Sequence, residues 1–173
     1  TCRTHVKKVL GSSKTIEVGP LRNLPVIKDL VVDMDTFFDK WIAVGGVHHP
    51  SKNRHQSIEK ISESSAKRIL ANEAVECINC GVCYASCDVV SANSDYFGPA
   101  ALNRAWSLVN DVKTKNKDSV LEAVSGNAGC HNCHSQQNCS TYCPNELNPS
   151  ASIASLKRTV FASKINNLFG NSK

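Results

Sequence analysis

The sequence lacks long apolar runs, because no stretch approaches the roughly 18 consecutive apolar residues that cross a membrane as a helix. Any membrane contact must therefore go through a partner or a surface patch. Aromatic residues are also scarce, at 6% of the 173 residues, and the 20 lysines and arginines are dispersed rather than gathered in a stripe. The net charge of +5 therefore does not indicate nucleic-acid binding.

Cysteine, by contrast, is abundant, and the grouping of the nine cysteines disfavours a secreted disulfide framework. Their number is odd, and eight of them fall in two tight groups between Cys-poor flanks. Metal ligation fits better, and eight clustered thiols are more than the four ligands of one structural zinc ion. The opening Thr1-Cys2-Arg3-Thr4-His5 has no initiator methionine or signal peptide. We therefore expect the C-terminal part of a longer protein.

The first group, Cys77-Ile-Asn-Cys80-Gly-Val-Cys83-Tyr-Ala-Ser-Cys87, has the C-x2-C-x2-C-x3-C spacing of an iron–sulfur loop. Its first three cysteines are three residues apart, so one turn of loop can fold around a cubic cluster, with Gly81 relieving the backbone nearest to sulfur. In two-cluster ferredoxins the fourth cysteine of such a run binds the other cluster. Cys87 therefore predicts a second cysteine group.

The second group comprises Cys130, Cys133, Cys139 and Cys143, followed by Pro144. Aligned with the first run, it has cysteines at positions one, three and four, and Gln136 stands where the second cysteine would be. With the fourth cysteines exchanged, a [4Fe–4S] site is completed by Cys77, Cys80, Cys83 and Cys143, and a three-ligand [3Fe–4S] site by Cys87, Cys133 and Cys139. Cys130 is either a further ligand of the second site or, since the alignment places it outside the loop, a nearby free thiol.

Short elements are predicted in the first half of the chain. Lys14–Pro20 alternates polar and apolar residues, which predicts a strand ending at Gly19-Pro20. The chain is expected to be extended at the start of residues 27–33, and Asp33 or Asp35 can cap a helix from Met34 to about Val44. The apolar face of that helix comprises Phe37, Phe38, Trp41 and Ile42. A polar surface linker follows at Val47–Gln56, and then a helix from Ser57 or Ser62 through Leu70.

Helices are predicted after each cysteine group. Pro99 suits the first turn of a helix whose buried face comprises Ala100, Ala101, Leu102, Ala105, Trp106, Leu108 and Val109. A short helix is expected from Ser119 to Val124, and a last one from about Ser150 to Phe161 or beyond, with Ile153, Leu156, Val160 and Phe161 on its apolar face. This imperfect repeat of cysteine loop and departing helix predicts a mainly α fold.

Together these motifs resemble the iron–sulfur subunit of succinate dehydrogenase and fumarate reductase (respiratory complex II) over nearly all of the chain. The resemblance rests on Asp29-Leu-Val-Val-Asp-Met34, on the Cys77–Cys87 run, on Phe97-Gly-Pro-Ala-Ala101, and on Cys133–Pro149 followed by Leu156-Lys157. It implies a bacterial ferredoxin-like, two-cluster helical domain at residues 57–173 and a connecting helix and linker at 27–56. Residues 1–26 would be the tail of a β-grasp, plant-type ferredoxin domain that holds a [2Fe–2S] cluster.

The resemblance extends to further ligands and partners. In the family the last [2Fe–2S] ligand lies in an Ala-Cys-Lys/Arg-Thr segment, which Thr1-Cys2-Arg3-Thr4 resembles. The resemblance therefore implies that Cys2 is this ligand. The other three cysteine ligands would lie on a missing part of the protein or on another polypeptide. A flavoprotein with covalent FAD interconverts succinate and fumarate, and a membrane anchor exchanges electrons with quinone. The resemblance implies that this chain relays electrons between them, peripheral on the inner (respiratory) membrane, on its cytoplasmic or mitochondrial-matrix side.

Two residues match positions that approach the quinone head group in relatives, namely His134 and Lys157, although His134 can instead donate to cluster sulfide. The family's proline and tryptophan after the fourth cysteine are replaced here by Asp88 and Ala92. No catalytic residue is expected, because the dicarboxylate chemistry belongs to the flavoprotein.

Two other functions are compatible with paired cysteine groups. An electron carrier of the heterodisulfide-reductase or glycolate-oxidase kind would normally keep the second cysteine of the second run, where Gln136 stands. A zinc-stapled interaction module without redox activity would be colourless, whereas an iron–sulfur protein is brown.

Overall fold

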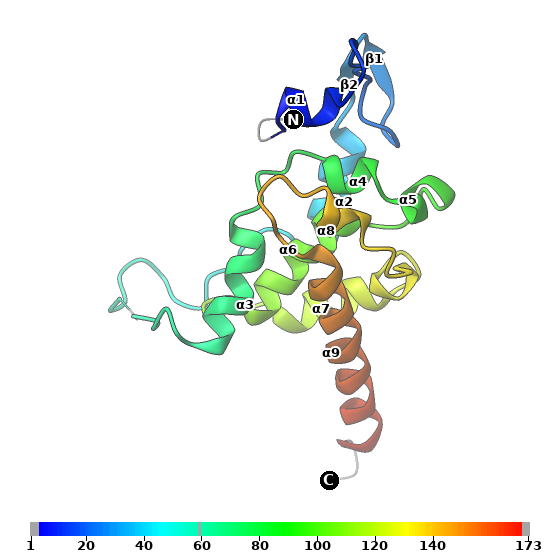
Figure 1. The fold of residues 1–173 in the computed structure, drawn as a ribbon. Helices are drawn as coiled ribbons and strands as arrows, with labels where there is room; N and C mark the ends of the chain where they lie inside the picture. Colours follow the sequence, from blue (N-terminus) through cyan, green and yellow to red (C-terminus); the bar gives the residue numbers. More distant parts are fainter. Residues whose placement is uncertain (1–3, 59, 171–173) are drawn as a thin grey trace.

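Helices dominate the computed structural model, in which residues 4–58 and 60–170 are described (Figure 1). The predicted mainly α fold is therefore confirmed. The elements in chain order are α1 (Val6–Leu10), β1 (Val26–Lys28), β2 (Val31–Val32), α2 (Asp35–Ala43), α3 (Ala66–Val75), α4 (Val82–Ala85), α5 (Asp88–Ala92), α6 (Pro99–Asn110), α7 (Lys117–Ser125), the 3-10 turn η1 (Cys130–Asn132), α8 (Asn138–Thr141) and α9 (Pro149–Gly170).

The centre of the fold is α6, which packs against α2, α3, α4, α7 and α9. Pro99 occupies its first turn, as predicted, and the small side chains of Ala100, Ala101 and Ala105 let neighbouring helices approach closely. Gly98 precedes it at φ 86°, where a Cβ would lie 2.6 Å from the ring of Tyr84. Only glycine fits both that backbone conformation and that contact, so α6 begins directly against the α4 turn.

The N-terminal segment reaches the cluster loops through an antiparallel β1–β2 hairpin, in which Val26 pairs with Val32, and through α2. The amide of Asn23 donates to three carbonyls at the end of α4, those of Tyr84, Ala85 and Cys87, at 3.0, 3.3 and 3.2 Å. The segment before α2 is thereby fixed against the first cysteine run. As predicted, α2 ends just before Gly45-Gly46, with Ala43 as its last residue.

Three predictions about local structure are wrong. Residues 14–20 form no strand and are exposed, because the described part of the chain provides no partner strand for their alternating pattern. The helix expected from Ser57 or Ser62 begins only at Ala66, because the hydroxyl of Ser65 accepts from the N–H of Arg68 and caps it there. Its burial falls on Ala71 and Ala74, whereas Ile58 is 89% exposed.

The third wrong prediction concerns apolar faces. On α2 only Phe37 is buried, while Phe38 and Ile42 are largely exposed. On α9 the residues Ile153, Leu156 and Val160 are buried as predicted, but Phe161 is 63% exposed.

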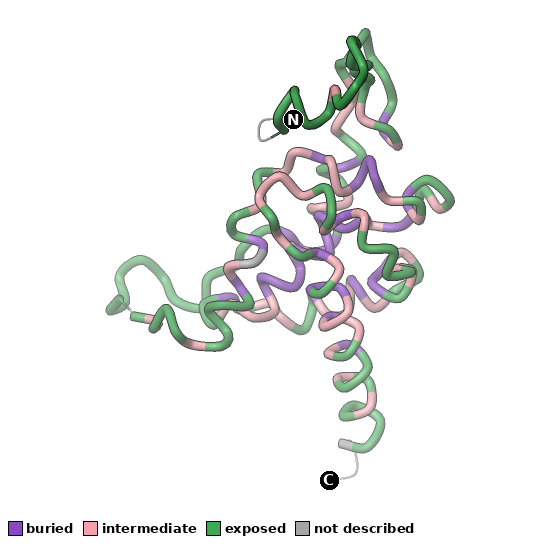
Figure 2. The backbone as a smooth tube through the Cα atoms, viewed as in Figure 1, coloured by how far each residue is buried: buried purple, intermediate pink, exposed green. Residues whose placement is uncertain are grey.

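The buried residues concentrate in the middle of the molecule, and the far half of α9 extends away from it with mainly exposed residues (Figure 2). The described residues of the loops at 47–58 and 60–64 are likewise exposed almost throughout, and this part of the chain is attached to the 113–115 segment by backbone hydrogen bonds. The prediction of a surface linker at Val47–Gln56 is confirmed. Within residues 4–58 and 60–170 no helix combines the length and apolar character needed to span a membrane.

Two thiol-lined cavities as candidate metal centres

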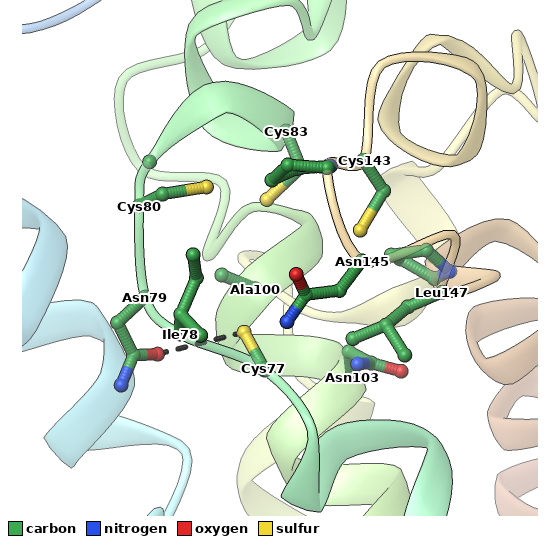
Figure 3. A pocket seen from close by; sticks show the side chains of 13 residues that line it. Cys77, Ile78, Asn79, Cys80, Cys83, Ala100, Asn103, Cys143, Asn145 and Leu147 are labelled. Atoms are coloured by element: carbon green, nitrogen blue, oxygen red, sulfur yellow. Dashed lines mark hydrogen bonds between the residues drawn. The ribbon is translucent and has the colours of Figure 1, made fainter. Parts of the chain in front are cut away.

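The first cavity is lined by four cysteines that come from two distant segments. Cys77, Cys80 and Cys83 belong to the first run, and Cys143 follows α8. Figure 3 shows their sulfur atoms directed toward one shared space. The remaining walls are largely apolar and include Ala100, Leu147 and Pro149. These are the four residues that the sequence predicted for a [4Fe–4S] site.

Two left-handed residues make the first loop turn around this cavity. Asn79 has φ 54° and Gly81 has φ 73°, and Gly81 is also the N-cap of the one-turn helix α4 that carries Cys83. Asparagine and glycine are the residues that adopt this conformation at least cost. The thiol of Cys77 donates to the side-chain oxygen of Asn79 over 3.7 Å. The local sequence therefore brings its three thiols to one side of the loop.

The second cavity is lined by Cys87, Cys133 and Cys139, together with Tyr96, His134, Ser135, Gln136 and Asn138. These three cysteines are the ones predicted for a [3Fe–4S] site, and Gln136 lies in the wall beside them. The backbone N–H of Ser135 donates to the sulfur of Cys133 at 3.4 Å.

The second loop repeats the backbone of the first. Ser135 has φ 58° and Gln137 has φ 66°, in the places that Asn79 and Gly81 hold in the first run. Gln137 is in turn the N-cap of α8, a one-turn helix like α4, and α8 carries Cys139 as α4 carries Cys83. This register puts Gln136 at the position of Cys80. Two non-glycine residues with positive φ are uncommon, so the repeat reflects a shared loop geometry rather than sequence chance.

The fourth cysteine of each run lies in the other run's cavity, as the sequence predicted. Cys87 lines the second cavity and Cys143 the first. A side-chain contact ties the two loops at the point where they cross, because the amide of Asn138 donates to the carbonyl of Ser86 at 3.1 Å.

Burial dominates the electrostatics of the thiols. Desolvation raises the pKa of Cys77, Cys83 and Cys87, and neighbouring thiols raise it further. Burial likewise raises the pKa of Cys139 to about 11, against a smaller lowering by the hydroxyl of Ser140. Such thiols ionise readily only when a cation offsets both effects. Thiolate-rich, apolar sites of this kind match the donor set of iron–sulfur clusters.

In the described ranges no three His, Cys, Asp or Glu side chains stand close enough to hold a single metal ion.

Cys130 is separated from both sites. It is fully buried in the hydrophobic core, in η1, which packs against α7 and α9. Burial raises the pKa of its thiol. Its side chain is not among the described residues that line the two thiol cavities.

The two residues expected near quinone are brought to one edge. His134 is exposed in the wall of the second cavity. The amine of Lys157, on α9, donates to the carbonyl of Cys133 at 2.6 Å, directly before His134 in the chain. The prediction that this helix packs back on the cysteine loop is confirmed. Cys2, expected as a [2Fe–2S] ligand, lies outside the described residues.

Three further side chains near the cavities were not predicted. The amine of Lys40 donates to the hydroxyl of Tyr84 and the carbonyl of Tyr96, both at 2.9 Å, and to the carbonyl of Ser94. Tyr96 is buried in the second cavity's wall, where burial raises the pKa of its phenol. Arg104 lies beside Cys77, and its only signal in the sequence is a charge that interrupts the apolar run of α6.

Two families of iron–sulfur domains match parts of this chain. A 4Fe-4S dicluster domain family matches residues 76–148, and a 2Fe-2S iron-sulfur cluster binding domain family matches residues 1–39.

Named relatives and a solved structure are similar to nearly the whole chain. An iron-sulfur subunit of mitochondrial succinate dehydrogenase [ubiquinone] from Oryza sativa is 31% identical over 152 residues, which cover 87% of this chain and 54% of the relative. The fumarate reductase iron-sulfur subunit of Haemophilus influenzae is 29% identical, over 88% of this chain and 62% of the relative. The succinate dehydrogenase iron-sulfur subunit of Bacillus subtilis is 31% identical, over 91% of this chain and 62% of the relative.

This chain thus spans between 54% and 62% of the lengths of these relatives. A chain of the Mycobacterium smegmatis Sdh1 complex in the apo form has the same fold, with a TM-score of 0.78 at 21% identity over 95% of this chain and 68% of that one.

Proposed function

Because this chain is a homologue of the iron–sulfur subunits of succinate dehydrogenase and fumarate reductase, we propose that it is the electron-transfer subunit of a succinate/fumarate:quinone oxidoreductase. It relays electrons between an FAD-containing flavoprotein, which holds the dicarboxylate site, and quinone at a membrane anchor. The observation that carries the proposal is the pair of thiol cavities with exchanged fourth cysteines and a repeated loop backbone.

The residues that would hold each group follow from the cavity walls. Cys77, Cys80, Cys83 and Cys143 hold a [4Fe–4S] cluster, and Cys87, Cys133 and Cys139 hold a [3Fe–4S] cluster. Gln136 occupies the Cys80 position of the second loop without a thiolate, which supports the three-iron assignment. When bound, these groups supply one-electron redox chemistry. Cys2 is proposed as one ligand of a [2Fe–2S] cluster whose other ligands come from outside this sequence.

The chain's own contribution is positioning and shielding. Residues of α6 and of the start of α9 form part of the wall of the first cavity, and Asn138 holds the second loop against the first. Lys157 holds the carbonyl of Cys133, so its charge lies at the same edge as His134. A donor and a cation there would bind and orient a quinone oxygen on which negative charge develops. The complex would be peripheral, attached to the respiratory membrane through its anchor.

The proposed domain arrangement accounts for both family matches. Residues 1–26 complete a plant-type ferredoxin domain, 27–56 connect, and 57–173 carry the two clusters with α6 at their centre. The match of residues 1–39 to a 2Fe-2S domain family and of 76–148 to a dicluster family supports the order of the two domains, although the first match extends past the proposed boundary at residue 26.

Metal and activity measurements on the native complex test the proposal. Anaerobically prepared complex should contain about seven irons bound to this chain and no stoichiometric zinc. It should oxidise succinate or reduce fumarate with quinone or quinol as the partner. Colourless protein with zinc and little iron would refute the assignment and favour an interaction module.

A further inference from the structure

A further cavity, of about 270 Å³ and distinct from the two thiol cavities, adjoins the first of them. The two share Cys77, Asn79 and Ala100 in their walls. The other residues around it are Trp41, Ala74, Val75 and Arg104. Among these described wall residues Arg104 alone is charged. A positive side chain therefore faces the same space as one ligand of the proposed four-iron site.

Two contacts with the end of α2 hold Arg104 in place. Its Nε donates to the carbonyl of Gly46 at 2.9 Å, and its guanidinium carbon lies 5.3 Å from the ring centroid of Trp41. Gly46 itself leaves no room for a side chain, because a Cβ there would lie 2.7 Å from Cε3 of Trp41. The glycine, the indole and the arginine form one packed unit, so the guanidinium is preorganised rather than free to swing into solvent.

The charge of Arg104 is not cancelled by a close carboxylate. Among the ion pairs of the described residues none involves Arg104, and the Asp111 carboxylate acts on it only through space. The side chain is half-buried, and burial lowers its pKa, but a guanidinium stays protonated in proteins. Arg104 and Cys77 line the same cavity, so the charge of the guanidinium acts on the Cys77 site across that space.

We propose that Arg104 raises the reduction potential of the four-iron cluster by holding an uncancelled positive charge beside Cys77. This inference rests on the proposed function. Reduction adds one electron, and hence one negative charge, to the Cys77 site, and a nearby fixed cation stabilises the more negative state. Arg104 is a positioning residue in this scheme, since it touches no substrate and acts through the charge that it places at the ligand.

The test is an EPR-monitored redox titration of the assembled complex, with electrons supplied one at a time by a chemical reductant. Arg104→Gln removes the charge and retains a hydrogen-bonding side chain. At a fixed ambient potential the ratio of reduced to oxidised four-iron cluster should fall about tenfold, which is a shift of about 59 mV to more negative potential for one electron. A merely structural role for Arg104 would not move the potential of a fully loaded cluster.

Matched variants separate charge from packing. Arg104→Lys keeps the charge and should keep most of the potential, whereas Arg68→Gln, at an exposed arginine of α3, should leave it unchanged because solvent screens that charge. If the glutamine variant loses iron, Arg104→Met, whose stem still packs on Trp41, should show the same shift. An unchanged potential in an iron-replete Arg104→Gln complex, or equal shifts in the Lys and Gln variants, would overturn the inference. Wild-type complex without iron would refute the proposed function and this inference with it.

Discussion

Replacing Lys157 with methionine should slow quinone-coupled turnover by about 10- to 150-fold. Succinate oxidation with an artificial dye that accepts electrons before the quinone site should remain nearly unchanged. The bond from its amine to the carbonyl of Cys133 is short, at 2.6 Å, and involves a charged donor. Such a bond contributes about 1.5–3 kcal/mol, and each 1.36 kcal/mol corresponds to a factor of ten in rate. The range follows if the amine makes a charged hydrogen bond of this strength to a quinone oxygen on which negative charge develops.

The structure supplies the controls for this prediction. Arg158, the next residue on α9, is exposed and donates to the hydroxyl of Ser155 at 2.9 Å, so Arg158→Met should leave both activities unchanged. His134→Phe, at the other side of the proposed quinone edge, should lower the quinone-coupled rate selectively as Lys157→Met does. Turnover with quinone and with dye is measured alongside iron content. Parallel losses in both assays with falling iron would show that Lys157 acts only as a brace for the Cys133 loop.

Two further predictions concern the second loop. Gln136→Cys should convert the three-iron centre to a four-iron one, because it places a thiolate at the position that Cys80 holds in the first loop. The variant should then lose the near-isotropic EPR signal of an oxidised three-iron centre. A wild-type protein without that signal would contradict the assignment. Asn138→Ala should lower the free energy of unfolding by about 1–3 kcal/mol, because it leaves the carbonyl of the buried Ser86 without its side-chain donor. Denaturant unfolding measures this change. An unchanged midpoint would show that water replaces the amide.

The cysteine groups and the helices bounded by glycine and proline could be predicted because their signals are local. Gly98-Pro99 marks the start of α6, and spacing alone grouped the seven thiols now found around two cavities. The start of α3 was missed because Ile58 and Ile61 mimic a helical face, whereas the cap at Ser65 decides where the helix begins. The exposure of Phe38 could not be predicted from periodicity, because it depends on which neighbours α2 meets.

Side-chain contacts between segments far apart in the chain could not be predicted from the sequence. Lys40 is separated from Tyr84 and Tyr96 by more than forty residues, and no periodicity links them. The left-handed backbone at Ser135 and Gln137 was similarly hidden, because neither residue type indicates positive φ as glycine does. The spacing of the cysteines had already placed Gln136 opposite Cys80, and the shared backbone of the two loops confirms that correspondence.

The exchange of Cys87 and Cys143 between the cavities interlocks the polypeptide. Under the proposed ligation, one cross-link joins Cys83 to Cys143 and another joins Cys87 to Cys133, so the first closes a ring of about sixty residues that contains α6 and α7. In a chain-entropy treatment, a covalent link that closes such a ring lowers the conformational entropy of the unfolded chain and thereby stabilises the folded state by about 4 kcal/mol. The ring cannot be divided into two separately maturing halves. Under this ligation each cluster takes thiolates from both cysteine runs. We therefore expect the two clusters to be inserted cooperatively, so that protein carrying only one of them is rare.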